Sequence, residues 1–412
     1  MNVLAVFSPL RNPRFARLYL AQTVSQLGDA LTWVGLALLA YQLAGGNASE
    51  VLGLALTLRV AAFVIFSPLA GVIADRIDRK WLLIGCDLGR CALVGLLPFV
   101  SSAFQVYILM FLVNALTAFF TPTNQASVPL VMGREDAGSA FALSSATTEL
   151  LGIVGPGLAG LAAAVLGGRN LFFLDAASFL GSGLLLLTLP SLRVARSSDP
   201  EPRSPWRDVR DGTARLWRDP PIRFALLMEL VASLAGALIL VQTVTRVKTG
   251  LNLGDLEYGW TMAAYGLGAT LASLGVAALG KRFPRTTFIR WGAILTVLAV
   301  LPGDIAPLAP LMGLWLLAGV GQNWVNLPTE TLLAERTEAA AQGRVYGAHF
   351  AWSHLWWAFA YPLVGWLGGH QSARVFLYGG LVALGVLLLT QVLHLRSGDE
   401  GKSALEPERQ PR

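Results

Sequence analysis

Apolar stretches long enough to cross a bilayer recur along most of this chain, and they constrain the fold more than any other feature. There are twelve of them, six on each side of one polar break. They lie near residues 15–41, 51–73, 81–101, 104–121, 139–166, 170–190, 222–246, 257–279, 286–303, 309–328, 345–368 and 372–394. A helix needs about 20 apolar residues to span the hydrocarbon core, where its backbone bonds are satisfied internally. The pattern predicts an all-α integral membrane protein with twelve transmembrane helices in two six-helix bundles.

The polar break divides the chain into domains. Residues 191–223 hold eight Arg, five acidic residues and five Pro, a composition that cannot bury itself. We expect a solvated linker there, with a short surface helix around Trp206–Trp217. The predicted domains are an N-terminal bundle at 1–190, a cytoplasmic linker at 191–223, a C-terminal bundle at 224–394 and a disordered cytoplasmic tail at 395–412.

The charge pattern predicts the orientation of the chain. Charged residues make up 14% of it, against about 25% in soluble domains, which excludes a large soluble core. With the N-terminus inside, cytoplasmic segments hold 24 of the 31 Lys and Arg residues, and three lie within helices. Four lie in external loops, at Arg169, Arg246, Lys248 and Arg374. The asymmetry predicts cytoplasmic termini, and it explains the net charge of +6 without nucleic-acid binding.

An internal repeat supports the six-plus-six division. One offset of 206 residues relates several turn-forming and basic positions in the two halves. The pairs are Gly53 with Gly259, Pro122 with Pro328, Pro156 with Pro362, Arg76 with Arg282 and Arg79 with Arg285. A single gap-free offset favours duplication of a six-helix unit.

A charged loop, GVIADRIDRK at residues 71–80, interrupts the apolar sequence between the second and third predicted helices. Gly71 allows close helix approach, Asp75 is placed to face the positive end of another helix, and the basic residues hold the loop at an anionic surface. A plain basic turn is the alternative. The loop resembles the signature of the major facilitator superfamily, which implies a conformational gate. Its matching residues are Gly71, Asp75, Arg76, Arg79 and Lys80, and Asp78 stands where the family usually has glycine.

A second motif lies in the fifth predicted helix. Pro156 removes a backbone hydrogen bond and bends the helix, while Gly155 and Gly160 allow close packing. The three residues resemble part of the antiporter motif of superfamily exporters, and Ala159 replaces one of its glycines. A generic kinked helix is the alternative.

Three further stretches are similar to bacterial efflux permeases of the same superfamily, at residues 22–29, 120–126 and 343–347. That branch includes macrolide-efflux, enterobactin-exporter and nickel-resistance permeases. The resemblance implies proton-coupled efflux of small organic molecules, of drug or siderophore type, by alternating access across a bacterial inner membrane. Many relatives carry an arginine in the fourth helix, whereas Asn114 is the polar anchor of residues 111–120 here.

Three ionisable residues lie deep within predicted helices: Asp29, Arg59 and Glu149. Each costs several kcal/mol in a bilayer unless it is paired or hydrated, so they are candidates for transport or for a structural network. Asp29 is the leading proton-coupling carboxylate, with Arg59 as its electrostatic partner, and Glu149 is the alternative carrier.

Other ionisable residues within the apolar segments have simpler interpretations. Asp87 and Arg90 lie three apart on one helix and are expected to pair with each other. Asp175 and Glu229 lie nearer helix ends, where snorkelling of the side chain to the interface or hydration can satisfy them.

The eleventh predicted helix is unusually aromatic. His349, Trp352 and Trp356 follow helical spacing, and His354, Trp357 and Tyr361 follow it on an adjacent face. Facing a cavity they would suit a flat or cationic organic substrate, and the alternative is packing or lipid contact. The substrate-cavity candidates are Asn114, Trp324, His349, Trp352, His354 and Trp356.

Other function classes remain as alternatives. A divalent-metal exporter is the rival within transport, although His349 and His354 are badly spaced for one metal ion and no metal site is predicted. A membrane receptor or scaffold is the rival outside transport. No phosphate-binding loop or hydrolase constellation is present, so we expect neither ATP drive, nor a cofactor, nor an enzyme. The expected partners are a small-molecule substrate, protons and the lipid bilayer, with no nucleic acid, and the chain is expected to be a monomer.

Overall fold

The computed structural model describes residues 7–74, 76–133, 136–193, 205–279, 282–338 and 342–403, and this part of the chain is helical without a strand. The N-terminal helices are α2 (Pro13–Ala44), α3 (Ala48–Ala74), α4 (Arg79–Leu96), α5 (Ala103–Met132), α6 (Ala137–Leu166) and α7 (Leu171–Leu187). The C-terminal helices are α9 (Pro220–Thr245), α10 (Asp255–Leu279), α11 (Arg285–Val300), α12 (Leu308–Arg336), α13 (Gln342–His370) and α14 (Val375–Ser403). Each coincides with one predicted apolar segment, so the predicted fold class is confirmed.

The short elements connect these helices. They are the 3-10 turns η1 (Ser8–Arg11), η2 (Gly45–Asn47), η3 (Leu97–Phe99), η4 (Gly168–Asn170) and η7 (Ser372–Arg374), the π-turn η5 (Arg246–Gly250) and the linker helix α8 (Pro205–Arg218). By length and composition alone, six described segments are apolar enough to cross a membrane, and one of them, Pro13–Ser67, covers α2 and most of α3. The bent helix α6 makes a seventh.

Local sequence signals set the helix ends. Asn12 caps α2 by accepting from the amide of Arg14 at 3.0 Å, with proline at the first helical position. Ser102 and Gln105 form a capping box on α5, which satisfies two amides that the helix itself leaves free. Gly133 and Gly167 end α5 and α6 with φ of 84° and 85°, a conformation that glycine adopts without strain.

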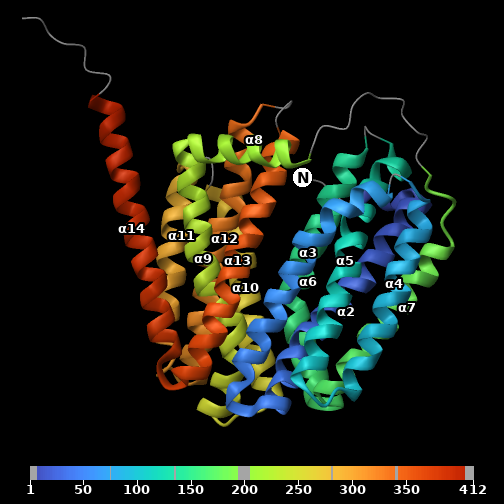
Figure 1. The fold of residues 1–412 in the computed structure, drawn as a ribbon, viewed down its shortest axis with the longest axis horizontal. Coiled ribbons are helices and arrows are strands. Elements are labelled where there is room, and N and C mark those ends of the chain that lie inside the picture. The colour runs from blue at the N-terminus through green and yellow to red at the C-terminus, as the bar shows by residue number, and fades with distance from the viewer. Residues whose placement is uncertain are drawn as a thin grey trace, which may run out of the picture.

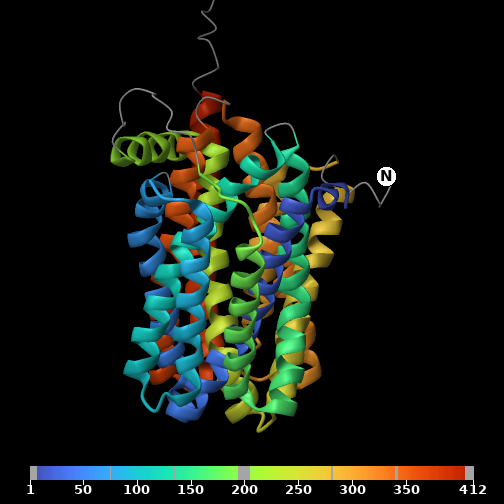
Figure 2. The ribbon, with the colours of Figure 1, turned by 90° about the vertical axis from the view of Figure 1, so that its right-hand side faces the viewer.

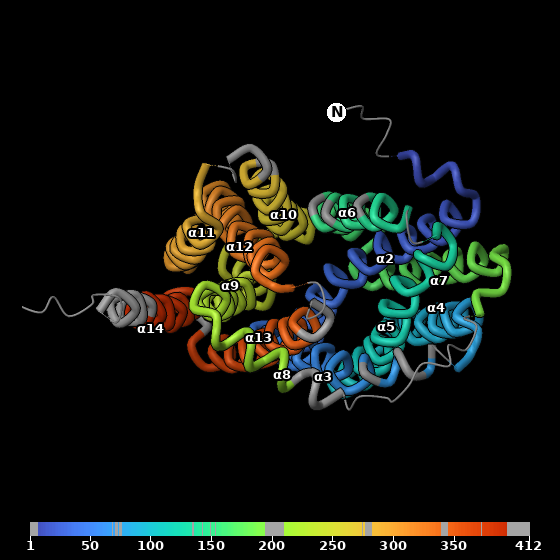
Figure 3. The backbone as a smooth tube through the Cα atoms, turned by 90° about the horizontal axis from the view of Figure 1, so that it is seen from above, coloured from blue at the N-terminus to red at the C-terminus, as the bar shows by residue number. Residues whose placement is uncertain are grey.

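The two bundles lie side by side, related by a rough twofold arrangement. In Figure 1 the N-terminal helices occupy the right and the C-terminal helices the left. Viewed from above, α3 lies against α13, and α6 lies against α10 (Figure 3). The N-terminal end of the described chain and the C-terminal end of α14 lie at the same end of the molecule (Figure 1). The linker helix α8 crosses the helix axes at that end (Figure 2).

Glycines allow two close backbone contacts between the bundles. A methyl group in place of the Gly160 hydrogen would lie 2.3 Å from Cα of Gly259, and one at Gly53 would lie 3.0 Å from Cα of Gly365. Gly53 and Gly259 are positions related by the offset of 206 residues, so the repeat places one glycine at each contact. Both contacts lie at the end opposite the termini, and at the other end the ribbons of the two bundles diverge (Figure 1).

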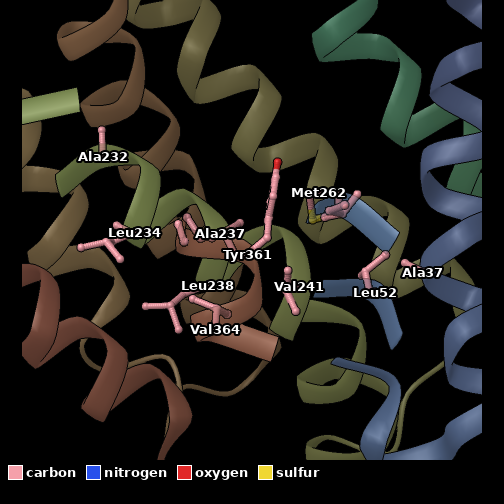
Figure 4. Packing of buried hydrophobic residues seen from close by; sticks show 14 of the residues in the cluster. Ala37, Leu52, Ala232, Leu234, Ala237, Leu238, Val241, Met262, Tyr361 and Val364 are labelled. Carbon is pink, nitrogen blue, oxygen red and sulfur yellow. The ribbon is translucent and has the colours of Figure 1, made fainter. Parts of the chain in front are cut away.

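A continuous apolar core joins the bundles through α9. Ala37 of α2 and Leu52 of α3 belong to the same buried cluster as Val241 of α9 and Met262 of α10, and Figure 4 shows them together. In the most apolar part of Pro220–Gly250, 83% of the residues are buried inside the protein. This fraction is about twice that of the other spans. The helix α9 is therefore surrounded by protein.

Several sequence predictions concern the ends and bends of helices. The predicted surface helix is present as α8, and α14 extends to Ser403, beyond the predicted end of the C-terminal bundle at 394. Residues 194–204 and 404–412 lie outside the described residues. The helix α6 bends by 41° between Gly152 and Val154. Pro156 has no N–H, so the carbonyl of Gly152 lacks its usual hydrogen-bond partner in the helix. The bend lies at this carbonyl.

Candidate functional site

Two adjoining hollows lie between the bundles and share Trp33 and Leu240 in their walls. The first, of about 290 Å³, lies among α2, α3, α6, α9 and α10 and is lined by Asp29 and Pro156. The second, of about 330 Å³, lies among α2, α3, α9 and α13 and is lined by Arg59. We call the two together the central cavity. Each hollow is of a size that holds a small organic molecule.

Asp29 faces the central cavity from the middle of α2. Its side chain is partly exposed there, and it makes no hydrogen bond or ion pair with any residue that the structure describes. Gln26 and Thr148 line the same hollow and hydrogen-bond to each other at 3.0 Å. A carboxylate at this depth is costly without a partner, so a proton, water or a bound cation must satisfy it.

Arg59 faces the central cavity from α3, on the other side of Trp33. Its guanidinium carbon lies 4.2 Å from the centre of the Trp33 ring and 5.8 Å from that of Phe63. Within the described ranges Arg59 makes no hydrogen bond or ion pair, so its interaction with Asp29 is electrostatic and longer in range. Because Asp29 and Trp33 are four residues apart on α2, they share one helix face. The indole therefore lies next to Arg59 and on the same face of α2 as Asp29.

A buried set of charged groups lies behind Asp29 in the N-terminal bundle. Asp87 and Arg90 form an ion pair as predicted, and Ser182 donates to Asp87 at 2.7 Å. Asp175 is fully buried and accepts from Thr32 and Ser178, so the expectation that hydration satisfies Asp175 is wrong. The reason is that Gly28 has no side chain, which lets α7 bring Asp175 against α2.

The helix-kink motif lies where α6 meets its neighbours. A methyl group at Gly155 would lie 2.6 Å from Cβ of Ala30 on α2, and Gly160 forms the contact with Gly259 of α10. Pro156 lines the central cavity. The three motif residues thus contact the adjacent helix, the cavity and the other bundle in turn.

The charged loop is tied to helices of its own bundle. Arg79 donates to the carbonyl of Ala126 at 2.6 Å, and the Lys80 amine donates to the carbonyls of Leu187 and Leu189 at 2.8 and 2.6 Å. Arg76 is exposed, and Gly71 lies in α3. Asp75 and the side chain of Glu149 lie outside the described residues.

Asp78, where the superfamily usually has glycine, holds this loop in place. It caps α4 through the amide of Lys80 at 3.0 Å and accepts from the Ser191 hydroxyl at 2.6 Å and the Leu192 amide at 2.9 Å. Burial favours the neutral acid, but these hydrogen bonds and the charge of Arg193 outweigh it and lower the pKa of Asp78. Asp78 therefore links the start of α4 to the segment that follows α7.

Of the six predicted substrate-cavity residues, His354 alone lines the central cavity described here. Asn114 instead donates to its own helix, at the Met110 carbonyl, and Trp324 packs on Phe288 of α11. Trp324 thus faces a helix of its own bundle, and neither side chain is part of the central cavity. Their prediction as cavity residues is not supported by their position.

The other three predicted cavity residues lie on the face of α13 that turns away from the N-terminal bundle. His349 bonds Glu229 of α9 at 2.9 Å, so Glu229 is buried and paired rather than hydrated. Trp352 contacts α8, where its Nε1 donates to Thr213 at 3.3 Å, and Trp356 packs on Trp352. This face of α13 packs against α8 and not toward the cavity. The spacing of residues along α13 does not predict that contact.

Sequence reasoning missed several cavity residues. Trp33 and Tyr258 were not singled out, and Trp357 and Tyr361 were noted only for their spacing with His354. The position of Trp33 four residues after Asp29 was an available signal. Within the described ranges, no three His, Cys, Asp or Glu side chains are grouped as ligands of a metal ion.

Comparison with known proteins places these features in context. The sequence matches the model of the Major Facilitator Superfamily over residues 18–251 and 225–411. It is 25% identical to the MFS-type transporter YfiS of Bacillus subtilis over 80% of each chain, and 27% identical to the enterobactin exporter EntS of Shigella boydii over 93% of each chain.

Solved structures share the fold. The nucleoside transporter NupG superposes with a TM-score of 0.72 at 13% identity, over 91% of this chain and 98% of that one. A bacterial homologue of the lysosomal transporter Spinster, inward-facing and occupied, superposes with a TM-score of 0.72 at 13% identity, over 95% and 97%. At these identities the likeness shows the fold alone.

Proposed function

The chain belongs to the Major Facilitator Superfamily, and we propose that it is a proton-coupled exporter of small organic molecules that works by alternating access. The observation that carries the proposal is the central cavity between the bundles, where Asp29 and Arg59 each face space without a partner among the described residues. Transport requires no chemical conversion of the cargo, so this activity is not enzymatic. The export direction rests on the antiporter-type motif and on the exporter EntS among the relatives.

The glycine contacts support a rocking motion of the bundles. Gly160 meets Gly259 backbone to backbone, and Gly53 meets Gly365 in the same way, so at these two points the helices of the two bundles approach without a side chain between them. With the termini in the cytoplasm of a bacterial inner-membrane protein, as the charge pattern predicts, the contacts close the outer end. The described arrangement is then the inward-facing state, and the cavity receives cargo from the cytoplasm.

Asp29 is the proposed proton carrier. It faces the cavity, whereas Asp87 and Asp175 are buried and already hydrogen-bonded. The positive charges of Arg90 and Arg59 act on it from within the same bundle. When the cavity closes on one side of the membrane and opens on the other, Asp29 can exchange its proton with the other compartment. Arg90 and Arg59 belong to the same bundle as Asp29 and move with it.

The loop at residues 71–80 is the proposed gate. Arg79 and Lys80 fasten it to carbonyls of its own bundle, so motion of the bundle carries the loop as one body. By resemblance, Asp75 then meets the start of α13 near residues 343–346 when the outer end opens. We propose that the monomer is the working unit, because the cavity is complete within one chain.

Everted membrane vesicles from an efflux-deficient host test the function. A panel of drugs, catechol compounds and Ni²⁺ first identifies a compound whose toxicity the chain lowers in cells. Adding that compound to respiring vesicles should release lumenal protons, seen by a pH-sensitive dye, with the wild-type chain but not with Asp29→Asn. Asp211→Asn on the exposed face of α8 is the matched control.

Three results contradict parts of the proposal. Uptake of the compound by wild-type vesicles without proton release rules out proton coupling. Normal proton release by a well-folded Asp29→Asn variant rules out Asp29 as the carrier. Protection against Ni²⁺ alone replaces the organic substrate by a metal ion.

A further inference from the structure

The central cavity holds two opposite charges that do not neutralise each other directly. Asp29 and Arg59 lie in adjoining hollows, and no described residue forms an ion pair or hydrogen bond with either. In contrast, Asp87 pairs with Arg90, and Glu229 pairs with His349. Among these six charged groups, the two that face the cavity are unpaired, and the four paired ones lie inside the bundles.

Trp33 lines the space next to both charges. Its ring carries the Arg59 guanidinium at 4.2 Å, and its side chain belongs to the walls of both hollows. On the Arg59 side the walls are aromatic, with Phe63, Trp357 and Tyr361. A flat molecule in this space would meet ring faces along its length and one charge at each end.

From this arrangement we propose that the cargo is a flat zwitterion, with its anionic group on Arg59, its rings beside Trp33 and its cationic group on Asp29. The guanidinium keeps its N–H donors for two parallel bonds to a carboxylate or similar oxyanion. Asp29 supplies the only unpaired carboxylate that the described lining of the cavity contains. Each charge of the cargo thereby satisfies a charge that is costly at this depth.

The inference rests on the proposed function and adds a physical reason why cargo is exchanged for a proton. The charged groups within electrostatic reach of Asp29 are Arg59 on α3, Asp87 and Arg90 on α4, and Asp175 on α7. Of these five groups, Asp29 and Arg59 line the cavity and are open to the cargo. Since the Asp29 carboxylate cannot hold a proton and a cationic group together, cargo and proton exclude each other, as exchange requires.

A matched set of three probes tests the charge preference. Norfloxacin is a flat zwitterion, its ethyl ester retains only the cationic amine, and its N-acetyl derivative retains only the carboxylate. Binding to the purified full-length chain in detergent is measured by calorimetry at pH 7.4. We expect the zwitterion to bind at least tenfold more tightly than either singly charged probe.

Substitutions assign each half of the preference. Arg59→Gln should lower the affinity for the zwitterion to that of the wild-type chain for the ester. Asp29→Asn should lower it to that of the wild-type chain for the N-acetyl derivative. Arg59→Lys, which keeps the charge, should retain part of the preference. Arg374→Gln and Asp211→Asn, both exposed and outside the cavity, should bind all probes as the wild type does. Thermal unfolding of each variant shows that it is folded.

The outcomes separate this inference from the proposed function. Equal binding of the three probes, or no binding of the zwitterion at millimolar concentration, overturns the zwitterion assignment. So does an unchanged preference in folded Arg59→Gln or Asp29→Asn. Because the measurement uses no gradient, proton-driven efflux that persists alongside such a result leaves the proposed function intact. The charge preference without any proton movement in vesicles contradicts the coupling instead.

Discussion

Replacing Gly160 by alanine should shift the conformational equilibrium away from the described state. The new methyl carbon would lie 2.3 Å from Cα of Gly259, whereas two carbon atoms in contact need about 3.5–4.0 Å. The two helices must separate by more than about 1 Å, and overpacking of this kind costs about 1–3 kcal/mol. Because the clash exists only where the bundles touch, the opposite state gains about 5- to 150-fold in population.

Matched variants grade the effect. In Gly53→Ala the atom nearest to the new methyl carbon is the Tyr361 carbonyl oxygen, at 2.8 Å. This clash is milder, so we expect a smaller shift of the conformational equilibrium in the same direction. Gly152→Ala lies on the same helix as Gly160 and meets nothing within 4 Å. It should leave the equilibrium unchanged and stabilise the helix by up to about 1 kcal/mol.

The assay is the accessibility of a cysteine at Ser49, which is fully buried at the end of the molecule that the glycine contacts close. In a chain whose Cys86 and Cys91 are replaced by serine, a membrane-impermeant maleimide should label Ser49→Cys slowly. Adding Gly160→Ala should speed the labelling, Gly53→Ala should speed it less, and Gly152→Ala should not. Equal labelling rates with Gly160→Ala and Gly152→Ala would refute the contact as a conformational determinant.

Further predictions follow from the charged loop and from the charge pattern. Asp78→Ala should lower the stability of the folded chain by about 1 kcal/mol at pH 7, since a helix cap is lost. The pKa of Asp78 in the folded chain lies below its ordinary value, so its contribution to stability is present above about pH 4 and is lost as the pH falls through the folded-state pKa. Thermal unfolding of variant and wild type at about pH 3 and pH 7 should show that their stability difference is smaller at the lower pH. Asp75→Asn should reduce export several-fold at normal expression, because a carboxylate at a helix N-terminus contributes about 0.3–2 kcal/mol; unchanged export removes the gate role. A cysteine at Asn47 should react with impermeant maleimide in intact cells and one at Ser198 should not, and the reverse pattern would invert the topology.

The sequence by itself determined the architecture, because a bilayer leaves few choices. Apolar stretches of spanning length must become helices, and their number, spacing and charged ends predict the bundles and the linker helix α8. Local pairs were equally accessible: Asp87 and Arg90 are three apart on one helix, so spacing alone predicts their ion pair. The same holds for the bend at Pro156, which is a property of one residue in one helix.

Tertiary structure alone decided which side chains face the cavity. In a helix that is apolar all round, periodicity does not distinguish a face in lipid from one in a neighbouring helix or a cavity. On α13 the face with His354 and Tyr361 lines the cavity, while Trp352 packs beneath α8, although both faces are aromatic. Asp175 is buried because α7 packs closely on Gly28, a contact between residues about 150 positions apart. Such contacts depend on how distant helices dock, and spacing along one helix carries no information about docking.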